Sequence, residues 1–451
     1  MKNISKKRVA YILYILFVAI FGFYARLWWI HNIPTQQVFD FETYQEIATN
    51  IFQHKGHSFG GEPIAFQGMA YPMALGYLYR WMGSNDIMIA KTFNVVLSTL
   101  TYIISFFIFA RLTNKLWVLA TAFTVVALLP NYIAYTNVVG TEVLSAFLFS
   151  VVILLQLYPF DKRLHYPLLG LFIGITALAK PFFMAYPVVA AAALWLREKD
   201  VKKTAVYFAA LFAVMVLVIA PWTYRNYQKF GRFIPVSYNS GYVFYLNNNE
   251  NNSSGSWMPI KDMYATEEFR RQVDEILEHG QRSEKLAHEL DPLFKAEAKK
   301  WILENPGKFL KLGFLRVKGT FFSGAWDIDS WTMNELREKQ EWWDKVAFER
   351  NKNLFRGFSD MMIHLMSSFG LAYVFFNAKP ALISLFNKKT LLGNHLIIPT
   401  VNIGFFLAIY FIFEGQARYN FPLLFLLAIS AVLCIERIHR GFANTGNNPQ
   451  A

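Results

Sequence analysis

The stretch VAYILYILFVAIFGFYA (9–25) is uncharged and almost entirely apolar, which is the pattern of a helix inside a lipid bilayer. A helix that crosses a bilayer needs about 20 mostly apolar residues. Similar runs recur at 204–220 and 421–435, and 55% of the chain is hydrophobic while only 17% is charged. This composition is too apolar for an ordinary soluble protein. The sequence therefore predicts an all-α polytopic membrane protein.

Apolar segments that could cross the membrane recur along most of the chain. Lys and Arg collect in the cytoplasmic loops of membrane proteins, and here they follow every second segment. Both termini are therefore predicted to be cytoplasmic, and topology accounts for the formal net charge of +13 without a nucleic-acid partner. The ten predicted crossings lie near 9–30, 87–110, 116–134, 139–158, 166–180, 181–196, 203–221, 357–377, 393–413 and 418–436.

This topology divides the chain into three parts. Residues 1–221 form an amino-terminal transmembrane module, whose first outer loop spans 31–86. Residues 222–356 are predicted to be an extracytoplasmic segment between the seventh and eighth helices. Residues 357–451 contain the last transmembrane helices and a cytoplasmic tail.

Three shorter segments carry expectations of their own. Residues 166–196 are short for two full crossings, so we expect two short helices that meet at Pro181 and leave Lys180 recessed on the outer side. The Asn-rich stretch 247–256 is interpreted as a mobile connector. The alternation of basic and apolar residues over 305–322 is typical of a helix that lies on the membrane interface.

Charged residues gather on the predicted outer side, next to apolar runs where unpaired charges are costly. A carboxylate can remove a proton from an acceptor hydroxyl, and cations can stabilise a phosphate that departs. For any one residue, an ion pair that fixes helix positions is the simpler interpretation; for the set on one face, group transfer from a phosphate carrier is favoured. The set is Asp40, Glu42, Lys180, Arg225 and Arg418.

Several motifs in order resemble a known family. They are Asp40 with Tyr44 and Ala48, then IAFQGMAYP (64–72), YIAYTNVVGTEVL (132–144), GLFIGITALAKPF (170–182), PWTYRNYQKFGRFIPVSYNSGY (221–242), ENPGKFLKL (304–312) and ARYNFPLL (417–424). Together they resemble GT-C glycosyltransferases of the dolichyl-phosphate-mannose–protein mannosyltransferase group, glycosyltransferase family 39. Gln67 and Met69 stand where the family usually has Arg and Pro, which argues against a phosphate or sugar role for that loop.

The resemblance implies a GT-C fold and an inverting sugar transfer from a polyprenyl-phosphate donor on the extracytoplasmic side. Asp40 matches the family's catalytic Asp and is expected to be the general base. Lys180, Arg225 and Arg418 are the candidates that bind the donor phosphate, since Arg offers a bidentate fork and Lys a point charge.

Other residues receive weaker roles. Glu42 has a supporting role at most, because it shares a face with Asp40 in a strand but points away in a helix. Tyr44 and Tyr71 either line the sugar site or anchor the chain at the membrane interface. Glu142 either orients a cation or caps a helix, and the cap is favoured.

No cofactor is expected. The chain has no P-loop or nucleotide-binding glycine pattern, and the histidines of the first outer loop show no compact metal-binding spacing, so no metal ligands are assigned. The expected partners are a polyprenyl-phosphate-linked sugar, the lipid bilayer and an extracytoplasmic acceptor, which is a cell-envelope glycan, a lipid or a protein.

Two other classes of membrane protein were weighed. A secondary transporter should show internal repeats and charges near the middle of the membrane, and the sequence shows neither. A lipid-linked polymer ligase or polymerase would share an Arg-rich outer site but would lack the first-loop Asp motif. The sequence therefore favours a plasma-membrane glycosyltransferase with its active site outside the cell.

Overall fold

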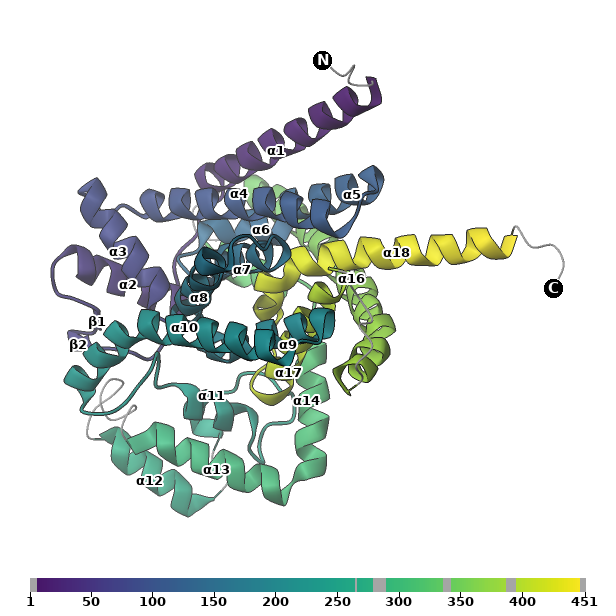
Figure 1. The fold of residues 1–451 in the computed structure, drawn as a ribbon. Coiled ribbons are helices and arrows are strands. Elements are labelled where there is room, and N and C mark those ends of the chain that lie inside the picture. The colour runs from purple at the N-terminus through teal and green to yellow at the C-terminus, as the bar shows by residue number, and fades with distance from the viewer. Residues whose placement is uncertain (1–5, 264–265, 279–288, 336–341, 387–394, 447–451) are drawn as a thin grey trace.

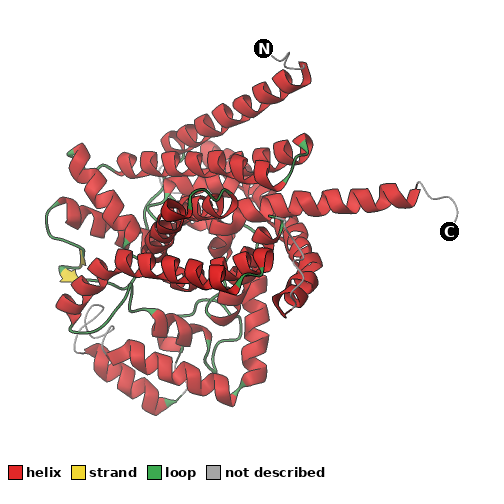
Figure 2. Ribbon diagram, in the orientation of Figure 1, coloured by secondary structure: helices red, strands yellow, loops and turns green. Residues whose placement is uncertain are grey.

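The computed structural model describes residues 6–263, 266–278, 289–335, 342–386 and 395–446, and these are almost entirely helical (Figures 1 and 2). The bundle contains α1 (Lys6–Asn32), α4 (Ile87–Leu112), α5 (Leu116–Ala127), α6 (Pro130–Ala134), α7 (Thr141–Leu157), α8 (Lys162–Ala179), α9 (Tyr186–Glu198), α10 (Val201–Phe230), α16 (Trp342–Phe386), α17 (Ile397–Ile412) and α18 (Leu424–Gly446). The intervening segments contain α2 (Asp40–Phe52), β1 (Ser58–Phe59), β2 (Glu62–Pro63), α3 (Ala70–Met82), α11 (Ser240–Asn247), α12 (Glu267–Glu278), α13 (Asp291–Glu304), α14 (Pro306–Phe321) and α15 (Trp326–Thr332). Short 3-10 turns are η1 (Tyr135–Asn137), η2 (Pro181–Ala185), η3 (Ile260–Asp262) and η5 (Ala417–Leu423).

Five of these helices are long and apolar enough to cross a membrane: α1, α4, α10, α16 and the segment of η5 and α18. The pair of α5 and the α6–η1 segment, bent by 40°, makes a sixth if it counts as one broken span. Each of the ten apolar segments coincides with helix in the structure, and α7 and α17 are shorter apolar helices. The chain is thus a multi-pass helical membrane protein, and the count of ten crossings stays a prediction.

The connections of the bundle separate into two groups. At one end, the first intervening segment meets η5 through an ion pair between Asp40 and Arg418. At the other end, Arg111 of α4 donates a hydrogen bond to the carbonyl of Leu157 at the end of α7. In Figure 1 the start of α1 and the end of α18 lie away from α2 and α3. The positions of the termini relative to the membrane and the orientation of the protein in it stay predictions.

Two helices extend beyond the limits drawn from hydropathy. Helix α10 continues through Pro221 to Phe230, where Gly231 ends it in the left-handed conformation (φ 66°), as helix-terminal glycines commonly do. Helix α16 already begins at Trp342. The limits at 221/222 and 356/357 therefore fall inside helices, because hydropathy marks the edge of the bilayer and not the end of the helix.

The break at Pro181 is confirmed. Helix α8 ends at Ala179, and Lys180 has an extended backbone (φ −135°, ψ 102°) before η2 and α9 follow. The side chain of Lys180 therefore lies at the junction of two short helices, as expected from the sequence.

The interpretation of 247–256 as a mobile connector is wrong. Asn247, Asn248 and Asn249 are fully buried. The buried Arg316 of α14 donates one hydrogen bond to Oδ1 of Asn248 (2.7 Å) and another to the carbonyl of Phe411 in α17 (2.7 Å). Asparagine side chains can replace backbone hydrogen-bonding partners in irregular segments, which composition alone does not reveal. The predicted helix over 305–322 is confirmed as α14.

The first intervening segment is structured rather than an open loop. Helices α2 and α3 pack together where Gly76 faces Ile51, and a Cβ at Gly76 would come within 2.6 Å of the Cβ of Ile51. Between them, β1 and β2 form an antiparallel hairpin whose turn residues, Gly60 and Gly61, both have positive φ (59° and 86°). Glycine adopts this conformation without steric cost, so Gly60 and Gly61 allow the tight turn between the two strands.

Candidate active site

Asp40 is the first residue of α2 and is held by two partners. Its Oδ1 accepts a hydrogen bond from Nε2 of Gln67 (2.8 Å), and its Oδ2 accepts one from Nη2 of Arg418 (2.8 Å). The preceding Phe39 has φ 54° and ψ −120°, a conformation that is unfavourable for a residue with a side chain. The Asp40 side chain remains 38% exposed. The carboxylate is therefore fixed in direction and still reachable by a substrate.

Arg418 approaches this carboxylate from the far end of the chain, in η5. Its guanidinium lies over the ring of Trp331, 4.7 Å from the ring centroid, and its side chain is only 11% exposed. Its Nε has no hydrogen-bond partner among the described residues. The stacked ring holds the fork in place, and the guanidinium keeps donor capacity for a second anion.

Lys180 forms a second ion pair with Glu142, at 3.5 Å between Nζ and Oε1. Glu142 is buried in the first turn of α7, and its Oε2 has no partner among the described residues. The residue at the N-terminal cap of α7 is Gly140, with no side-chain capping bond. The favoured interpretation of Glu142 as part of a helix cap is therefore wrong, because its carboxylate turns toward the cation.

The two tyrosines lie inside the protein and not at a lipid interface. Tyr44 and Tyr71 are buried, with ring centroids 6.2 Å apart. Burial raises the pKa of Tyr44, and the negative charge of Asp40 raises it further, so its hydroxyl stays protonated. The hydroxyl of Tyr71 donates to Oδ1 of Asn94 (3.0 Å). Tyr71 therefore packs behind Tyr44, and a sugar-lining role for either remains a prediction.

Of the two conformations considered for Glu42, strand and helix, the structure shows the helix. It lies in the first turn of α2 and is exposed. Two positions apart on a helix, side chains point to nearly opposite faces. Its carboxylate therefore points away from the face on which Asp40 meets Arg418.

Arg225 is placed differently from the other cations. Its Nη1 donates to the carbonyl of Ile64 (3.0 Å), and its Nη2 donates to the carbonyl of His57 (2.8 Å). Its guanidinium lies 4.6 Å from the ring centroid of Trp222. Within the described part of the chain, none of its hydrogen bonds reaches Asp40. These contacts join α10 to the hairpin, so they favour a structural role, and phosphate binding by Arg225 remains a prediction.

The loop that carries Gln67 was not expected to contribute to the site, yet Gln67 donates a hydrogen bond to Asp40. The neighbouring Gly68 explains how the loop comes so close: a Cβ there would lie 2.2 Å from the carbonyl oxygen of Ala179, beside Lys180. No pattern in the sequence identifies this contact, because Gln67 and Asp40 lie on separate segments that only the fold brings together.

A further buried acid lies near the site. Asp327 of α15 accepts a hydrogen bond from the hydroxyl of Tyr135. Burial raises the pKa of Asp327 to about 6, and the positive charge of Arg418 opposes that rise. In the sequence, Asp327 is only an acid beside a tryptophan, and this position does not identify Tyr135 as its partner.

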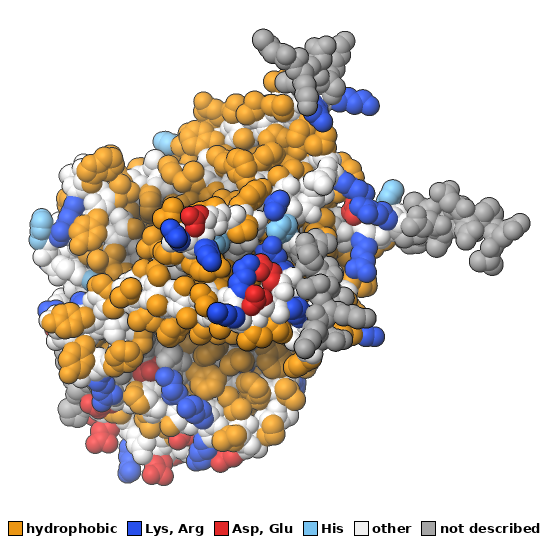
Figure 3. Space-filling view, in the orientation of Figure 1, with side chains coloured by type: hydrophobic (Ala, Val, Ile, Leu, Met, Phe, Trp, Pro, Cys, Tyr) orange, Lys and Arg blue, Asp and Glu red, His pale blue; other side chains and the backbone are white. Residues whose placement is uncertain are grey.

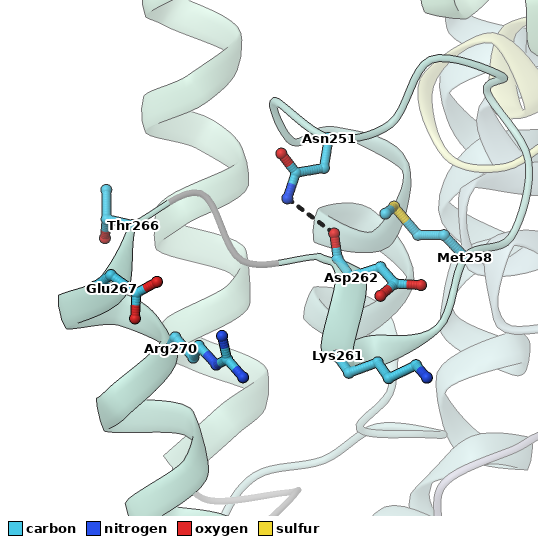
Figure 4. A pocket seen from close by; sticks show the side chains of 7 residues that line it. All are labelled: Asn251, Met258, Lys261, Asp262, Thr266, Glu267 and Arg270. Carbon is cyan, nitrogen blue, oxygen red and sulfur yellow. Dashed lines mark hydrogen bonds between the residues drawn. The ribbon is translucent and has the colours of Figure 1, made fainter.

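The described residues contain no group of three or more His, Cys, Asp or Glu side chains that could hold a metal ion. A cavity of about 700 Å³ lies elsewhere, around α12 and the preceding loop (Figure 4). It contains none of the site residues discussed above. Its lining residues are Asn251, Met258, Lys261, Asp262, Thr266, Glu267 and Arg270.

No family model and no curated protein matches this chain. Solved structures do match it. The Archaeoglobus fulgidus oligosaccharyltransferase tethered with an acceptor peptide is 12% identical, with a TM-score of 0.52, over 96% of this chain and 50% of that one. The archaeal oligosaccharyltransferase AglB from the same organism, in complex with an inhibitory peptide and a dolichol-phosphate, is 12% identical, with a TM-score of 0.52, over 97% and 52%.

ArnT from Cupriavidus metallidurans, bound to undecaprenyl phosphate, is 12% identical over 95% of this chain and 78% of that one, with a TM-score of 0.43 that is too low to support an argument. The chain spans about half the length of the oligosaccharyltransferases. At this identity the likeness shows the fold alone. It supports the GT-C-type architecture, and membership of family 39 stays a prediction.

Proposed function

We propose that this protein is a membrane glycosyltransferase that moves a sugar from a polyprenyl-phosphate donor to an extracytoplasmic acceptor with inversion. The observation that carries the proposal is the ion pair of Asp40 and Arg418, which joins a partly exposed carboxylate to a cation with spare donor capacity. The fold shared with oligosaccharyltransferases supports it. One of those structures contains a dolichol-phosphate, which is a lipid of the proposed donor class.

In the proposed reaction, Asp40 accepts the proton of the acceptor hydroxyl while the hydroxyl oxygen attacks the anomeric carbon. The bond between the anomeric carbon and the phosphate oxygen breaks, and the polyprenyl phosphate leaves with the electron pair. Attack opposite to the leaving group inverts the configuration. Gln67 holds the carboxylate in position for this transfer.

Arg418 and Lys180 are proposed to stabilise the negative charge that grows on the departing phosphate. Each is paired with a carboxylate, so a phosphate can bind by sharing or replacing that partner. Two cations supply positive charge without a metal ion, and the proposed reaction requires no other cofactor. The lipid tail lies in the bilayer, which is why the enzyme is a membrane protein.

The test is sugar transfer by the purified protein with a panel of hexosyl and pentosyl polyprenyl phosphates, read as release of polyprenyl phosphate. Asp40→Asn should lower turnover by about 10²–10⁴-fold, the usual cost of losing a general base, while binding of polyprenyl phosphate is retained. Glu42→Gln is the matched control, since this carboxylate points away from the site, and it should stay near the wild-type rate. Wild-type transfer by Asp40→Asn would overturn the proposal.

A further inference from the structure

A second cavity lies at the opposite end of the bundle, the end that carries the basic loops. It has a volume of about 280 Å³ and lies between α7, α8, α9 and α10. Figure 3 shows Lys, Arg, Asp and Glu side chains clustered on an otherwise largely hydrophobic face over these helices. Six of its lining residues matter here: Gln156, Phe160, Lys162, His165, Arg197 and Lys203.

Three cations from three helices converge on this cavity. Lys162 begins α8, Arg197 lies in the last turn of α9, and Lys203 lies in the first turn of α10. Lys203 pairs with Glu198. No described residue forms a hydrogen bond or an ion pair with Lys162 or Arg197, although the carboxylate of Glu198, which also lines the cavity, attracts Arg197 electrostatically. The positive-inside rule explains basic residues in these loops, but it does not explain their convergence on one cavity, which suits an anion.

The floor of the cavity is polar and incompletely satisfied. Gln156 donates through Nε2 to the hydroxyl of Tyr186 (2.8 Å), but its Oε1 has no partner among the described residues. The Nδ1 of His165 likewise has none in the described chain. Both side chains line the cavity, although Gln156 is 6% exposed and His165 is 3% exposed. A carbonyl oxygen only accepts hydrogen bonds, so a ligand here should carry hydroxyl donors as well as its negative charge.

The mouth of the cavity adjoins an apolar surface. Phe160 lines the cavity and is exposed, and the exposed Leu164 and Val201 lie beside Lys162 and Lys203 in the chain. Exposed apolar side chains at the end of a membrane helix face lipid chains. This favours a ligand that is itself a lipid over a soluble phosphate.

We infer that this cavity binds the headgroup of an anionic phospholipid that carries free hydroxyls, of the glycerol-phosphodiester class. The phosphate lies against Lys162 and Arg197, a hydroxyl donates to Oε1 of Gln156, and the acyl chains pass Phe160. Basic pockets between membrane helices bind such headgroups in other proteins. The site lies at the other end of the bundle from Asp40 and does not depend on the proposed reaction.

The experiment measures lipid binding to the full-length purified protein by native mass spectrometry and by the shift of thermal unfolding on adding lipid. The probes are phosphatidylglycerol, phosphatidic acid, phosphatidylcholine and free glycerol 3-phosphate. The paired variant Lys162→Gln/Arg197→Gln removes the phosphate contacts and should weaken phosphatidylglycerol binding about tenfold or more. The matched control is Arg163→Gln/Lys202→Gln, which removes the same charge from neighbouring positions that do not line the cavity.

Gln156→Leu tests the hydroxyl contact separately. It should abolish the preference for phosphatidylglycerol over phosphatidic acid while leaving binding of both lipids. Equal losses in the paired variant and its control would show general surface charge and overturn the site. Equal binding of phosphatidylcholine would overturn the anion assignment, and saturable binding of free glycerol 3-phosphate at the same site would overturn the lipid assignment.

Discussion

Arg418 and Arg225 are two arginines that the sequence treats alike and the structure separates. Each guanidinium lies over a tryptophan ring, at 4.7 Å from Trp331 and 4.6 Å from Trp222. Arg418 pairs with a carboxylate and keeps Nε free among the described residues. Arg225 donates to two backbone carbonyls of the hairpin segment.

The difference lies in the acceptors. A backbone carbonyl is fixed by the fold, and leaving it unpaired in a buried place costs free energy. A partly exposed carboxylate can exchange its cation for water or for a substrate group. The position of an arginine at a helix end therefore does not decide whether it binds substrate; the partners of its donors do.

Between the two arginines, the larger effect on sugar transfer is expected at Arg418. Arg418→Ala should lower sugar transfer by about 10²–10³-fold, as for other groups that stabilise charge in the transition state. Arg418→Lys should recover only part of the rate, because the bidentate fork is lost. Turnover and polyprenyl-phosphate binding are both measured on variant protein that elutes like the wild type in size-exclusion chromatography, which shows that it is folded. If Arg418→Ala transfers sugar at the wild-type rate while Arg225→Ala does not, then Arg225 and not Arg418 acts on the substrate.

Asp327 tests how a buried acid near Arg418 contributes to stability. Burial raises the pKa of folded Asp327 to about 6, against roughly 4 in an unfolded chain. The stability from this group is therefore complete below about pH 4 and is lost as the pH rises through 6. A shift of about two pKa units corresponds to roughly 3 kcal/mol, which sets the upper limit.

Asp327→Asn should flatten this pH dependence, so that the variant gains on the wild type between pH 4.5 and 7.5 in denaturant unfolding. The neighbouring Asp329, which pairs with Arg356 at 3.1 Å, is the control, and Asp329→Asn should not flatten the profile. An unchanged profile for Asp327→Asn would mean that other groups dominate the response to pH.

Arg225 should affect stability more than catalysis. Arg225→Ala leaves the carbonyls of His57 and Ile64 without this donor, and we expect a loss of about 1–3 kcal/mol in the free energy of unfolding. Turnover per folded molecule should stay close to the wild-type value. The measurement compares the unfolding midpoint with the transfer rate of the folded fraction. A variant that is stable but inactive would indicate that Arg225 binds the donor phosphate.

The sequence predicted the architecture because burial in a bilayer leaves a strong signal. Uninterrupted apolar runs coincide with helices. Pro181 interrupts the helix between α8 and α9 because proline has no N–H and a fixed φ. The sequence also brought forward Asp40, Lys180 and Arg418, since charges beside apolar runs need partners. The structure gives each of them a partner.

The parts of the site that could not be predicted from the sequence depend on contacts between distant segments. Trp331 and Gln67 are ordinary residues in their own loops, and only the fold brings them to Arg418 and Asp40. The Asn-rich stretch 247–256 resembled a linker because composition does not show that Arg316 donates a hydrogen bond to the side chain of Asn248. Specific hydrogen bonds leave no periodic signal in a sequence.

A smaller catalytic effect than at Arg418 is expected at Gln67, a positioning residue that acts through Asp40. Gln67→Leu removes the hydrogen bond to Oδ1 and should lower turnover about tenfold, the cost of one hydrogen bond to a charged group, while the KM for the donor changes little. The control is Gln45→Leu in α2, which removes the acceptor for the hydroxyl of Tyr79 in α3 and should reduce stability without this loss of turnover. The ion pair with Arg418 holds only Oδ2 of Asp40. The hydrogen bond from Gln67 to Oδ1 therefore decides whether the carboxylate faces the acceptor. Equal turnover in Gln67→Leu and the wild type would show that Arg418 alone orients the base.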